Sequence, residues 1–592
     1  MQEVFDDLYA KSKNRKKYRF NKLMDIIKSE ENIQLAYRNI KKNKGSLTSG
    51  VNKKTILDIA QDDNELFVKK VQERLDNYHP HPVRRVEIPK PNGDKRPLGI
   101  PSIEDRIIQQ CIKQVLEPIC EGKFHNHSYG FRPNRSTHHA IARCYTLAQK
   151  VNFHYVVDVD IKGFFDNVNH SKLMKQMWSL GIQDKQLLCI IGKMLKAPIN
   201  GIGVPQKGTP QGGILSPLLS NIVLNELDWW ISDQWETYTT KRQYASISKK
   251  YRHLRTYSDL KELYIVRYAD DFKIFCKDYE TASKTYIATK NWLKERLSLE
   301  ISESKSKIVN LKTSYSDFLG FKIRVHQKGD TMTVRSHVND KAKKKMMNSI
   351  REQLKVIQTN TDVKNVNKYN SMILGMHNYY RVATHVNKDF SDVFNGTNKC
   401  FHNRTKYIRT RTSGKPPTKT YNKYYGKSEG KKIYIKDIII FPISSISTSP
   451  PLNFSQTVCD YTKEGREQIH KKLITVPAWM ICKLMSKPIE NMSIEYNDNR
   501  ISLFVAQKGI CPITNEFLDI DNMDCHHKIP REIGGDDKYK NLIIVKREVH
   551  KLIHARDINI INKYLQKLNL NNTQVEKVNE LRIKVGNTKI VV

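Results

Sequence analysis

The stretch Leu263–Cys276 reads LYIVRYADDFKIFC, two apolar runs on either side of the polar tip Ala269-Asp270-Asp271. The runs are rich in Ile, Val, Tyr and Phe, which favour β-strands, and a short polar tip between two strands predicts a tight hairpin. Adjacent carboxylates at such a tip repel each other unless a cation or water screens them. A solvated turn is the plain alternative, because Asp is common in turns. The apolar flanks and Tyr268 favour a buried hairpin that carries a metal site.

A second pair of carboxylates lies in Tyr155–Asp166, YVVDVDIKGFFD, which predicts a strand that leads into a helix. Asp158 and Asp160 fall on one face of that strand, because side chains alternate along a strand. A carboxylate inside an apolar run is costly unless it is paired or bound to a metal. A helix cap explains Asp166 but explains Asp160 poorly, so we expect Asp160 near a cation.

Composition and charge narrow the class of protein. The chain has 592 residues, enough for several domains, and 39% of them are hydrophobic, enough for real cores. Lys and Arg number 101 against 61 Asp and Glu, a net charge of +40 with a pI of about 9.6, so nucleic acid is the expected partner. No membrane partner is expected, because no long apolar segment or lipidation signal occurs. No secretory signal is expected, because the N-terminus MQEVFDDLYA has neither a basic start nor an apolar run. Ten scattered cysteines indicate a reducing cytoplasm, and a bacterial one is expected.

Basic and glycine-rich segments accompany the two carboxylate strands. Residues 83–101, VRRVEIPKPNGDKRPLGIP, turn at NGD between extended segments, and a basic hairpin of this kind can close over a triphosphate. Residues 208–216, GTPQGGILS, open a helix with glycines that let the backbone approach a ligand closely. Residues 128–136, SYGFRPNRS, add two arginines beside aromatics. In isolation, residues 83–101 could equally be a surface hairpin with ordinary lysines, and residues 208–216 could equally be an ordinary glycine turn.

Six segments in a fixed order together resemble the reverse transcriptase of group II introns. They are KRPLGIP, YGFRPNRS, DIKGFFD, GTPQGGILSPLLSN, RYADD and FLGF, and the resemblance covers roughly residues 30–325. It implies a multidomain α+β protein in which residues 1–330 form right-hand fingers and a palm built on an antiparallel sheet. It further implies that Asp160, Asp270 and Asp271 hold two Mg²⁺ ions, ~4 Å apart, which clamp the attacking 3′-hydroxyl and the leaving pyrophosphate.

The resemblance also implies a set of nucleotide-binding residues. Lys90 and Arg96 would neutralise the triphosphate, and Gln211 would line the pocket of the incoming nucleotide. Phe165 stands where this family carries an aromatic wall against the 2′-hydroxyl. Lys305 resembles the lysine that protonates the leaving group.

Residues 331–411 are expected to form a helical thumb and maturase domain. Apolar residues such as Met346, Ile350, Leu354 and Ile357 recur at spacings of three and four, which is typical of a helix packed in a bundle. The segment GMHNYY within this region resembles the maturase thumb.

Residues 412–500 are expected to hold a basic linker and a small DNA-binding region. Lysines and arginines with interleaved tyrosines run through residues 404–436, and cations with aromatics suit a single-stranded nucleic acid. Glycines and prolines in the same stretch favour a linker. A second basic run, KSKNRKKYR, makes Lys16, Lys17 and Arg19 candidate RNA contacts, although a charge run is usually a solvated face.

Residues 501–592 contain a histidine pattern that resembles an HNH endonuclease with its ββα-metal fold. Histidines at i and i+4 of a helix share one side and can share a metal. The resemblance implies that His526, His550 and His554 are the ligands of one divalent metal, expected to be Mg²⁺. By the same resemblance His527 is the general base and Asn541 holds the loop that orients it. Adjacent strand residues point oppositely, so which of His526 and His527 faces the metal stays open.

Many members of the HNH family add a structural zinc held by two pairs of cysteines. Here Thr514 follows Cys511 where a second cysteine is expected, and Val549 precedes His550 where another could stand. Cys511 and Cys525 alone make a poor zinc site, so no structural zinc is expected.

These features together predict a multifunctional group II intron-encoded protein. It would be an RNA-directed DNA polymerase, a maturase that assists splicing of its intron RNA, and an HNH endonuclease for target-primed reverse transcription and retrohoming. Its partners would be intron RNA, target DNA, primer-template and deoxynucleoside triphosphates. The alternatives are a free-standing reverse transcriptase, against which the thumb, basic linker and HNH pattern argue, and a splicing factor with dead active sites, against which the complete Asp and His sets argue.

Overall fold

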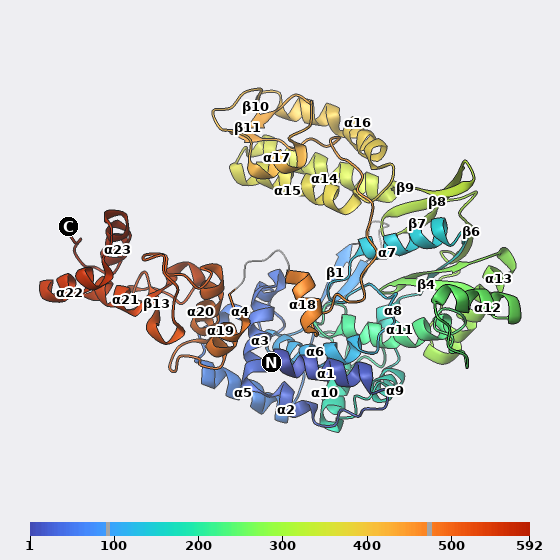
Figure 1. Ribbon diagram of the computed structural model, residues 1–592, viewed down its shortest axis with the longest axis horizontal. Helices are drawn as coiled ribbons and strands as arrows, with labels where there is room; N and C mark the ends of the chain where they lie inside the picture. Colours follow the sequence, from blue (N-terminus) through green and yellow to red (C-terminus); the bar gives the residue numbers. More distant parts are fainter. Residues whose placement is uncertain (90–94, 471–475, 592) are drawn as a thin grey trace. The chain divides into compact units, whose positions relative to one another are not determined.

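The computed structural model describes residues 1–89, 95–470 and 476–591, and its chain forms two compact units. One unit consists of Met1–Lys123, Asn169–Leu219 and Cys459–Val592, and the other consists of Phe124–Val168 and Ser220–Val458. Helices and strands occur in both units, which confirms the expected α+β class (Figure 1). Among the described residues, no helix combines the length and the apolar character needed to cross a membrane.

The second unit is built on an antiparallel sheet of four strands in the order β4-β5-β3-β6. The strands are β3 (Tyr155–Asp160), β4 (Leu263–Tyr268), β5 (Asp271–Cys276) and β6 (Lys307–Asn310). Strands β4 and β5 form the predicted hairpin, in which Tyr268 pairs with Asp271. Ala269, the first of the two tip residues, takes a positive φ of 58°, as the first position of a tight two-residue hairpin turn requires. Helix α13 (Tyr279–Trp292) packs on β3 and β5, and α7 (Thr137–Tyr145) packs on β4.

A second sheet and a helical bundle follow the four-stranded sheet in the chain. The sheet has the strand order β7-β8-β9, and the bundle consists of the helices that follow it in the chain. These elements are β7 (Ser316–Phe318), β8 (Phe321–Lys328), β9 (Thr331–Val338), α14 (Asp340–Thr359), α15 (Val363–Tyr380) and α16 (Val386–Thr405). Met346, Ile350, Leu354 and Ile357 of α14 are all buried, so the three-and-four spacing read from the sequence is the packed face of a helix.

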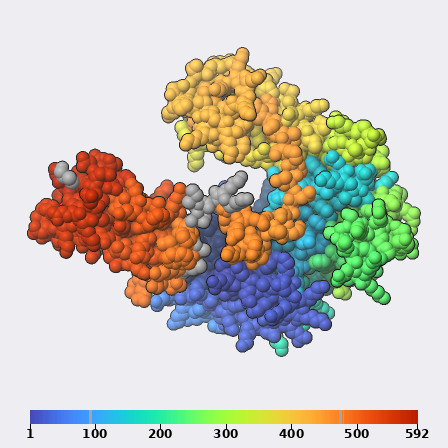
Figure 2. Space-filling model, in the orientation of Figure 1, coloured from blue at the N-terminus to red at the C-terminus, as the bar shows by residue number. Residues whose placement is uncertain are grey.

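Residues 409–446 pack against this bundle and do not behave as the expected linker. They contain β10 (Arg409–Thr410), α17 (Lys419–Tyr425), β11 (Tyr434–Ile435) and β12 (Ile438–Ile439), and Figure 2 shows them as one continuous body with the bundle helices. Tyr421, Tyr425 and Tyr434 are buried in the same apolar cluster as the bundle. These three tyrosines therefore stabilise the fold and are not available to stack on bases, whereas Tyr407 and Tyr424 are exposed.

The first unit surrounds α6 (Ile103–Glu121), a helix that is buried along most of its length. Helices α1, α2 and α3 pack on it. The bounds of the elements around it are α1 (Gln2–Asn14), α2 (Leu23–Ile27), α3 (Glu30–Lys41), α5 (Asn64–Asp76), β1 (Arg84–Pro89), β2 (Lys95–Ile100), α9 (His170–Ser179) and α10 (Lys185–Leu195). Strands β1 and β2 pair antiparallel as the expected basic hairpin.

The C-terminal part of the first unit has its own apolar core, which joins residues from Val476 to Leu581. Its elements are α19 (Ala478–Met485), α20 (Ile494–Ala506), β13 (Met523–His527), β14 (Leu542–Lys546), α21 (Arg547–His554), α22 (Ile558–Leu568) and α23 (Asn572–Lys584). Strands β13 and β14 pair antiparallel and α21 packs on both, which is a ββα arrangement. Because α20 belongs to this core, the packed region begins before residue 501, where the sequence pattern began it.

Candidate functional site

The strand register brings two of the predicted metal-binding aspartates face to face. Asp160 at the end of β3 pairs with Asp271 at the start of β5, and Asp270 occupies the hairpin tip beside them. Facing residues of antiparallel strands stand about 5 Å apart between Cα atoms, so both carboxylates project from one sheet end. Enclosure by protein atoms raises the pKa of Asp271 to about 6 although its side chain reaches solvent; Lys273 opposes this rise, and neighbouring carboxylates add to it. A divalent cation relieves such crowding of like charges.

Asp158 shares the strand face of Asp160 but has a different task. Its carboxylate accepts a hydrogen bond from the buried Lys273 ammonium, 2.5 Å away, and others from the Ser316 hydroxyl at 3.0 and 3.2 Å. Lys273 lies directly opposite Asp158 in the sheet. Asp158 is thus neutralised by protein groups, which leaves Asp160 as the strand's open carboxylate.

Two further predicted residues lie in the same unit as the aspartates. Lys305 places its Nζ 3.4 Å from Asp160 Oδ2, and both side chains are solvent-accessible. Phe165 follows β3 in the short helix α8 (Phe164–Asn167) and is half-buried, with its ring centroid 5.4 Å from that of Phe164. The fold therefore sets Phe165 five residues beyond Asp160, on the segment that leaves the carboxylate strand.

The hairpin is held in place by the buried Arg267, a residue that the sequence patterns did not indicate. Its guanidinium is 1% exposed and binds the fully buried Asp228 through two hydrogen bonds of 2.7 and 2.6 Å. The same group donates to Asn221 Oδ1 at 3.0 Å and to the Ala269 carbonyl at 2.8 Å. Arg267 thus ties the hairpin tip to α11 (Ser216–Ser232). The sequence does contain a sign of this role, because Arg267 is the one charged residue of the apolar run Leu263–Tyr268, and a buried charge requires a partner.

Residues 128–131 of the motif SYGFRPNRS dock on the edge of the hairpin. The Tyr129 amide donates to the Arg267 carbonyl at 2.8 Å, and the Arg267 amide donates to the His127 carbonyl at 3.0 Å. A Cβ on Gly130 would lie 2.3 Å from the Ala269 amide nitrogen, so only glycine fits there. This motif accordingly supports the tip that carries Asp270.

The structure brings Gln211 beside the basic hairpin of the first unit. The Gly99 amide of β2 donates to the Gln211 carbonyl at 2.6 Å. Gly212 has a positive φ of 112°, and an added Cβ there would lie 2.4 Å from the Gly99 carbonyl oxygen. The glycine at position 212, which was expected to let the backbone approach a ligand, instead lets it approach strand β2. Lys90 and the side chain of Arg96 lie outside the described residues.

Three predicted histidines converge at the ββα part. Ligand atoms of His526, His550 and His554 all lie within 4.8 Å of one another. Among the described residues, no other group of three or more potential metal ligands is this close together, and the three aspartates are not either. His526 is 1% exposed and its Nε2 has no hydrogen-bond partner among the described residues. Burial, and then the neighbouring histidines, lower the pKa of His526 to about 3. A buried, neutral imidazole beside two others offers a nitrogen of the kind that a metal ion takes as a ligand.

A carboxylate orients one histidine of this cluster. His550 Nδ1 donates to Asp524 Oδ2 at 3.0 Å, which leaves Nε2 as the ligand atom. His554 follows one turn later on α21, and its Nε2 lies 3.3 Å from His526 Nδ1. The i and i+4 spacing thus places both helix histidines on the side that faces β13.

His527 does not join the cluster, which separates the two histidines of the pair. Its Nε2 lies 2.7 Å from Asp537 Oδ1, and the Tyr496 ring stacks on its imidazole at a centroid distance of 5.3 Å. Burial alone would raise the pKa of Asp537, but hydrogen bonds from His527, Arg531 and Ser493 lower it well below its usual value. Asp537 and Tyr496 were missed by the sequence analysis, because loop and helix residues far apart in the chain give no local pattern.

Asn541 bridges the loop between β13 and β14. Its Oδ1 accepts from the Ile529 amide at 2.9 Å, and its Nδ2 donates to the Ile529 and Asp536 carbonyls at 2.9 and 2.8 Å. Cys511 and Cys525 are buried in the apolar core, and burial raises the pKa of the Cys525 thiol to about 12.

Cationic surfaces occur in both units. Lys16, Lys17 and Arg19 are exposed in the turn after α1. In the second unit, a cavity of about 410 Å³ between the bundle and residues 409–445 is lined by cationic and aromatic side chains that include Arg409, Arg411, Lys431, His402 and Phe394.

Comparisons with known proteins identify the family of the chain. The family described as reverse transcriptase (RNA-dependent DNA polymerase) matches residues 88–323. Protein YkfC of Escherichia coli strain K12 is 33% identical over 321 residues, which cover 52% of this chain and 83% of YkfC. The group II intron-encoded protein LtrA of Lactococcus lactis subsp. cremoris is 31% identical over 451 residues, which cover 62% of this chain and 72% of LtrA. A putative COX1/OXI3 intron 1 protein of Saccharomyces cerevisiae is 27% identical over 426 residues, 62% of this chain and 50% of that protein. The chain therefore belongs to the family of group II intron-encoded reverse transcriptases and maturases.

Proposed function

We propose that this protein copies RNA into DNA at the Asp160, Asp270 and Asp271 site, assists splicing of an intron RNA that it binds, and nicks DNA with its C-terminal ββα part. The observation that carries the polymerase proposal is the register that sets Asp160 opposite Asp271 with Asp270 at the tip. Hard carboxylate oxygens suit Mg²⁺.

In the polymerase proposal, Asp160, Asp270 and Asp271 would hold two Mg²⁺ ions, which would supply activation of the 3′-hydroxyl and charge stabilisation of the leaving pyrophosphate. Lys305, whose Nζ lies 3.4 Å from Asp160 Oδ2, would donate a proton to the leaving group. Lys90, Arg96 and Gln211 belong to the nucleotide-binding set by resemblance. Phe165 excludes a ribose 2′-hydroxyl by its bulk.

The polymerase proposal is tested by extension of a DNA primer annealed to RNA, with deoxynucleoside triphosphates and Mg²⁺. Extension should depend on Mg²⁺ and on both hairpin aspartates. Extension that survives replacement of Asp270 and Asp271 by Ala would mean that the metals lie elsewhere.

The nuclease proposal is supported by the histidine cluster. It is also supported by His527, which follows His526 in the sequence but contacts Asp537 and does not join the cluster. His526, His550 and His554 would hold one divalent ion, Mg²⁺ by our expectation, which supplies charge stabilisation at the scissile phosphate. His527 takes the proton of the attacking water, and Asn541 holds the loop around it. Its test is nicking of one strand of a plasmid that carries the joined exons flanking the gene, by protein assembled with the intron RNA. His527→Ala should abolish nicking while primer extension survives.

Binding of the intron RNA is proposed for the exposed cations Lys16, Lys17 and Arg19 and for the basic surface around the bundle cavity. RNA is recognised by shape and phosphate contacts, which need surface cations but no catalytic metal. Sequencing of RNA that copurifies with the protein is the direct test, and enrichment of a single intron is the expected result. A mixture without an enriched intron would favour a free-standing reverse transcriptase.

A further inference from the structure

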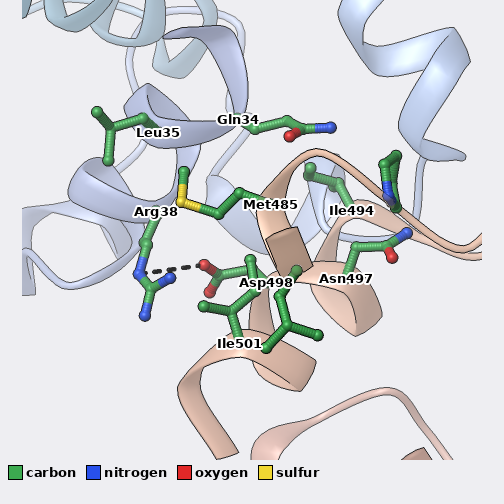
Figure 3. A pocket seen from close by; sticks show the side chains of 10 residues that line it. Gln34, Leu35, Arg38, Met485, Ile494, Asn497, Asp498 and Ile501 are labelled. Carbon is green, nitrogen blue, oxygen red and sulfur yellow. Dashed lines mark ion pairs between the residues drawn. The ribbon is translucent and has the colours of Figure 1, made fainter. Parts of the chain in front are cut away.

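Helix α20 connects the N-terminal helices of the first unit to the loop that carries Asp537. On one side it meets α3, where Tyr37 Oη donates to Glu495 Oε2 at 2.7 Å and Lys41 Nζ lies 2.9 Å from Glu495 Oε1 and 3.0 Å from Asp498 Oδ2. Figure 3 shows the same contact from close by, with Arg38 facing Asp498 at 3.7 Å. Leu35, Met485, Ile494 and Ile501 are among the side chains that line a small cavity at this contact.

Backbone groups reinforce this contact at the start of α20. The Ile494 amide donates to the Asp62 carbonyl at 3.0 Å, and the Asn64 amide donates to the Met492 carbonyl at 3.3 Å. The first turn of α20 is thus joined to the segment before α5 by main-chain bonds, which no side-chain substitution removes. Helix α20 is seated on the N-terminal helices by two independent sets of contacts.

The other side of α20 holds Asp537. The Ser493 hydroxyl, which caps α20, donates to the Asp537 carboxylate. Asn499 Nδ2 donates to the Asp537 carbonyl at 2.7 Å, while Asn499 Oδ1 accepts from Lys41 Nζ at 2.8 Å. A single buried amide therefore links a lysine of α3 to the backbone of Asp537.

Asp537 and α20 together fix His527. The imidazole Nε2 donates to Asp537 Oδ1, because an ionised carboxylate only accepts. This bond places the proton on Nε2 and leaves Nδ1 as the nitrogen that can accept one. Tyr496 of α20 stacks on the same ring at an interplanar angle of 20° and donates its hydroxyl to the Cys525 carbonyl at 2.8 Å. The ring is thereby held in both orientation and tautomer.

We propose that Asp537 is the positioning residue for His527, and that α20, seated on α3, holds Asp537 in place. The inference rests on the nuclease function proposed above and names what orients its base. The inference also makes nicking dependent on α3, a helix of the N-terminal part of the chain. Loosening the α3 contact should therefore slow nicking without any change at the polymerase aspartates.

The test uses the full chain assembled with in vitro transcribed intron RNA and a plasmid that carries the joined exons. Asp537→Asn keeps the size of the side chain but removes the charge that fixes the tautomer. We expect the nicking rate at saturating plasmid to fall by about 10- to 100-fold, with the plasmid concentration for half-maximal rate, Mn²⁺ binding and primer extension unchanged. Asp536→Asn, at an adjacent carboxylate that pairs with Lys538, is the matched control and should nick at the wild-type rate.

The α3 contact is tested by Tyr37→Phe combined with Lys41→Met, with Lys44→Met, at an exposed lysine beyond α3, as the control. The combined variant should nick about 3- to 10-fold more slowly than wild type and should keep its primer extension, since fixing a base in place is one part of its catalytic effect. Unchanged nicking in this variant would overturn the role of α3.

The outcome of His527→Ala separates this inference from the nuclease proposal. Wild-type nicking by Asp537→Asn, when His527→Ala is inactive, overturns the positioning role alone. If His527→Ala also nicks normally, the nuclease proposal itself fails. A simultaneous loss of Mn²⁺ binding and primer extension in Asp537→Asn would show a general structural defect and would equally overturn the positioning role.

Discussion

The aspartate hairpin and the histidine cluster are both proposed metal sites, yet the protein builds them in opposite ways. The hairpin presents its acids at the solvent end of the strands and buries the supporting charges, Arg267 with Asp228 and Lys273 with Asp158. The cluster buries the ligand His526 itself and leaves His554 exposed. Charged ligands are costly to bury, whereas a neutral imidazole is not. The chemical form of the ligand therefore decides which part of a site lies inside the core.

The largest effect that this comparison predicts is at the hairpin tip. Replacement of Asp270 and Asp271 by Ala should lower primer extension by about 1,000-fold or more, because several kcal/mol of charge stabilisation are lost. Intron splicing and nicking should continue, since neither uses these carboxylates. Asp259→Ala, at an exposed position before β4, is the control for the loss of acidic charge. A folded double variant that no longer promotes splicing would show that the two functions share one site.

The matching change at the cluster is His550→Ala, which removes one of three ligands. Nicking should fall by about 100-fold or more at fixed Mg²⁺, because a site with two imidazoles holds a metal weakly. Calorimetric titration with Mn²⁺ measures the binding directly, and primer extension should not change. His470→Ala, at an exposed histidine of α18 (Lys463–His470), controls for the loss of an imidazole. Normal nicking and Mn²⁺ binding by His550→Ala would remove this residue from the ligand set.

A third prediction concerns the supporting groups. Arg267→Met leaves the buried Asp228 without its partner and should lower the free energy of unfolding by about 3–5 kcal/mol. Asp524→Asn, which supports His550 at a partly exposed place, should lower Mn²⁺ affinity by about 10- to 100-fold with little loss of stability. Chemical denaturation and Mn²⁺ titration of both variants test the contrast. Equal stabilities would contradict the view that the hairpin depends on buried charge and the cluster does not.

A smaller effect is expected at Phe165. Removing the ring should relax the exclusion of ribonucleotides by about 10- to 200-fold, since the contact is steric and worth about 1–3 kcal/mol. The measurement is the ratio of ribonucleotide to deoxyribonucleotide incorporation under single-turnover conditions. Phe164→Leu, a change at the neighbouring buried ring, separates the wall itself from its packing. An unchanged ratio in Phe165→Ala would place the ring outside the nucleotide pocket.

The smallest effect belongs to the N-terminal cations. Replacing Lys16, Lys17 and Arg19 by Gln should weaken binding of the intron RNA while primer extension on a short template persists. Each lost phosphate contact should flatten the log–log dependence of affinity on salt by roughly 0.7 to 0.9. Filter binding across a salt series gives the slope. A parallel shift without a change of slope would mean that these residues do not contact phosphates.

The sequence predicted the local parts of both sites and missed the contacts that join distant parts. Alternation along β3 placed Asp158 and Asp160 together, and the i and i+4 pattern placed His550 with His554, because these relations depend only on strand and helix periodicity. Arg267 with Asp228 and His527 with Asp537 depend on how separate elements pack. No spacing rule reports such contacts. The tyrosines of residues 404–436 show the converse error, since composition indicated a nucleic-acid surface while burial makes three of them core residues.

The close approach of Gly130 to Ala269 has a consequence for how this protein tolerates change. The two segments are joined by backbone amides and carbonyls, so this joint does not depend on the chemistry of a side chain, although Tyr129 and Arg132 of the motif are buried. At Gly130 even a methyl group would collide with the chain. A saturation library of residues 128–136, selected for primer extension, should therefore retain almost no replacement at Gly130. A screen for second changes that restore extension to Gly130→Ala should recover substitutions in the hairpin tip, which the added methyl group would displace.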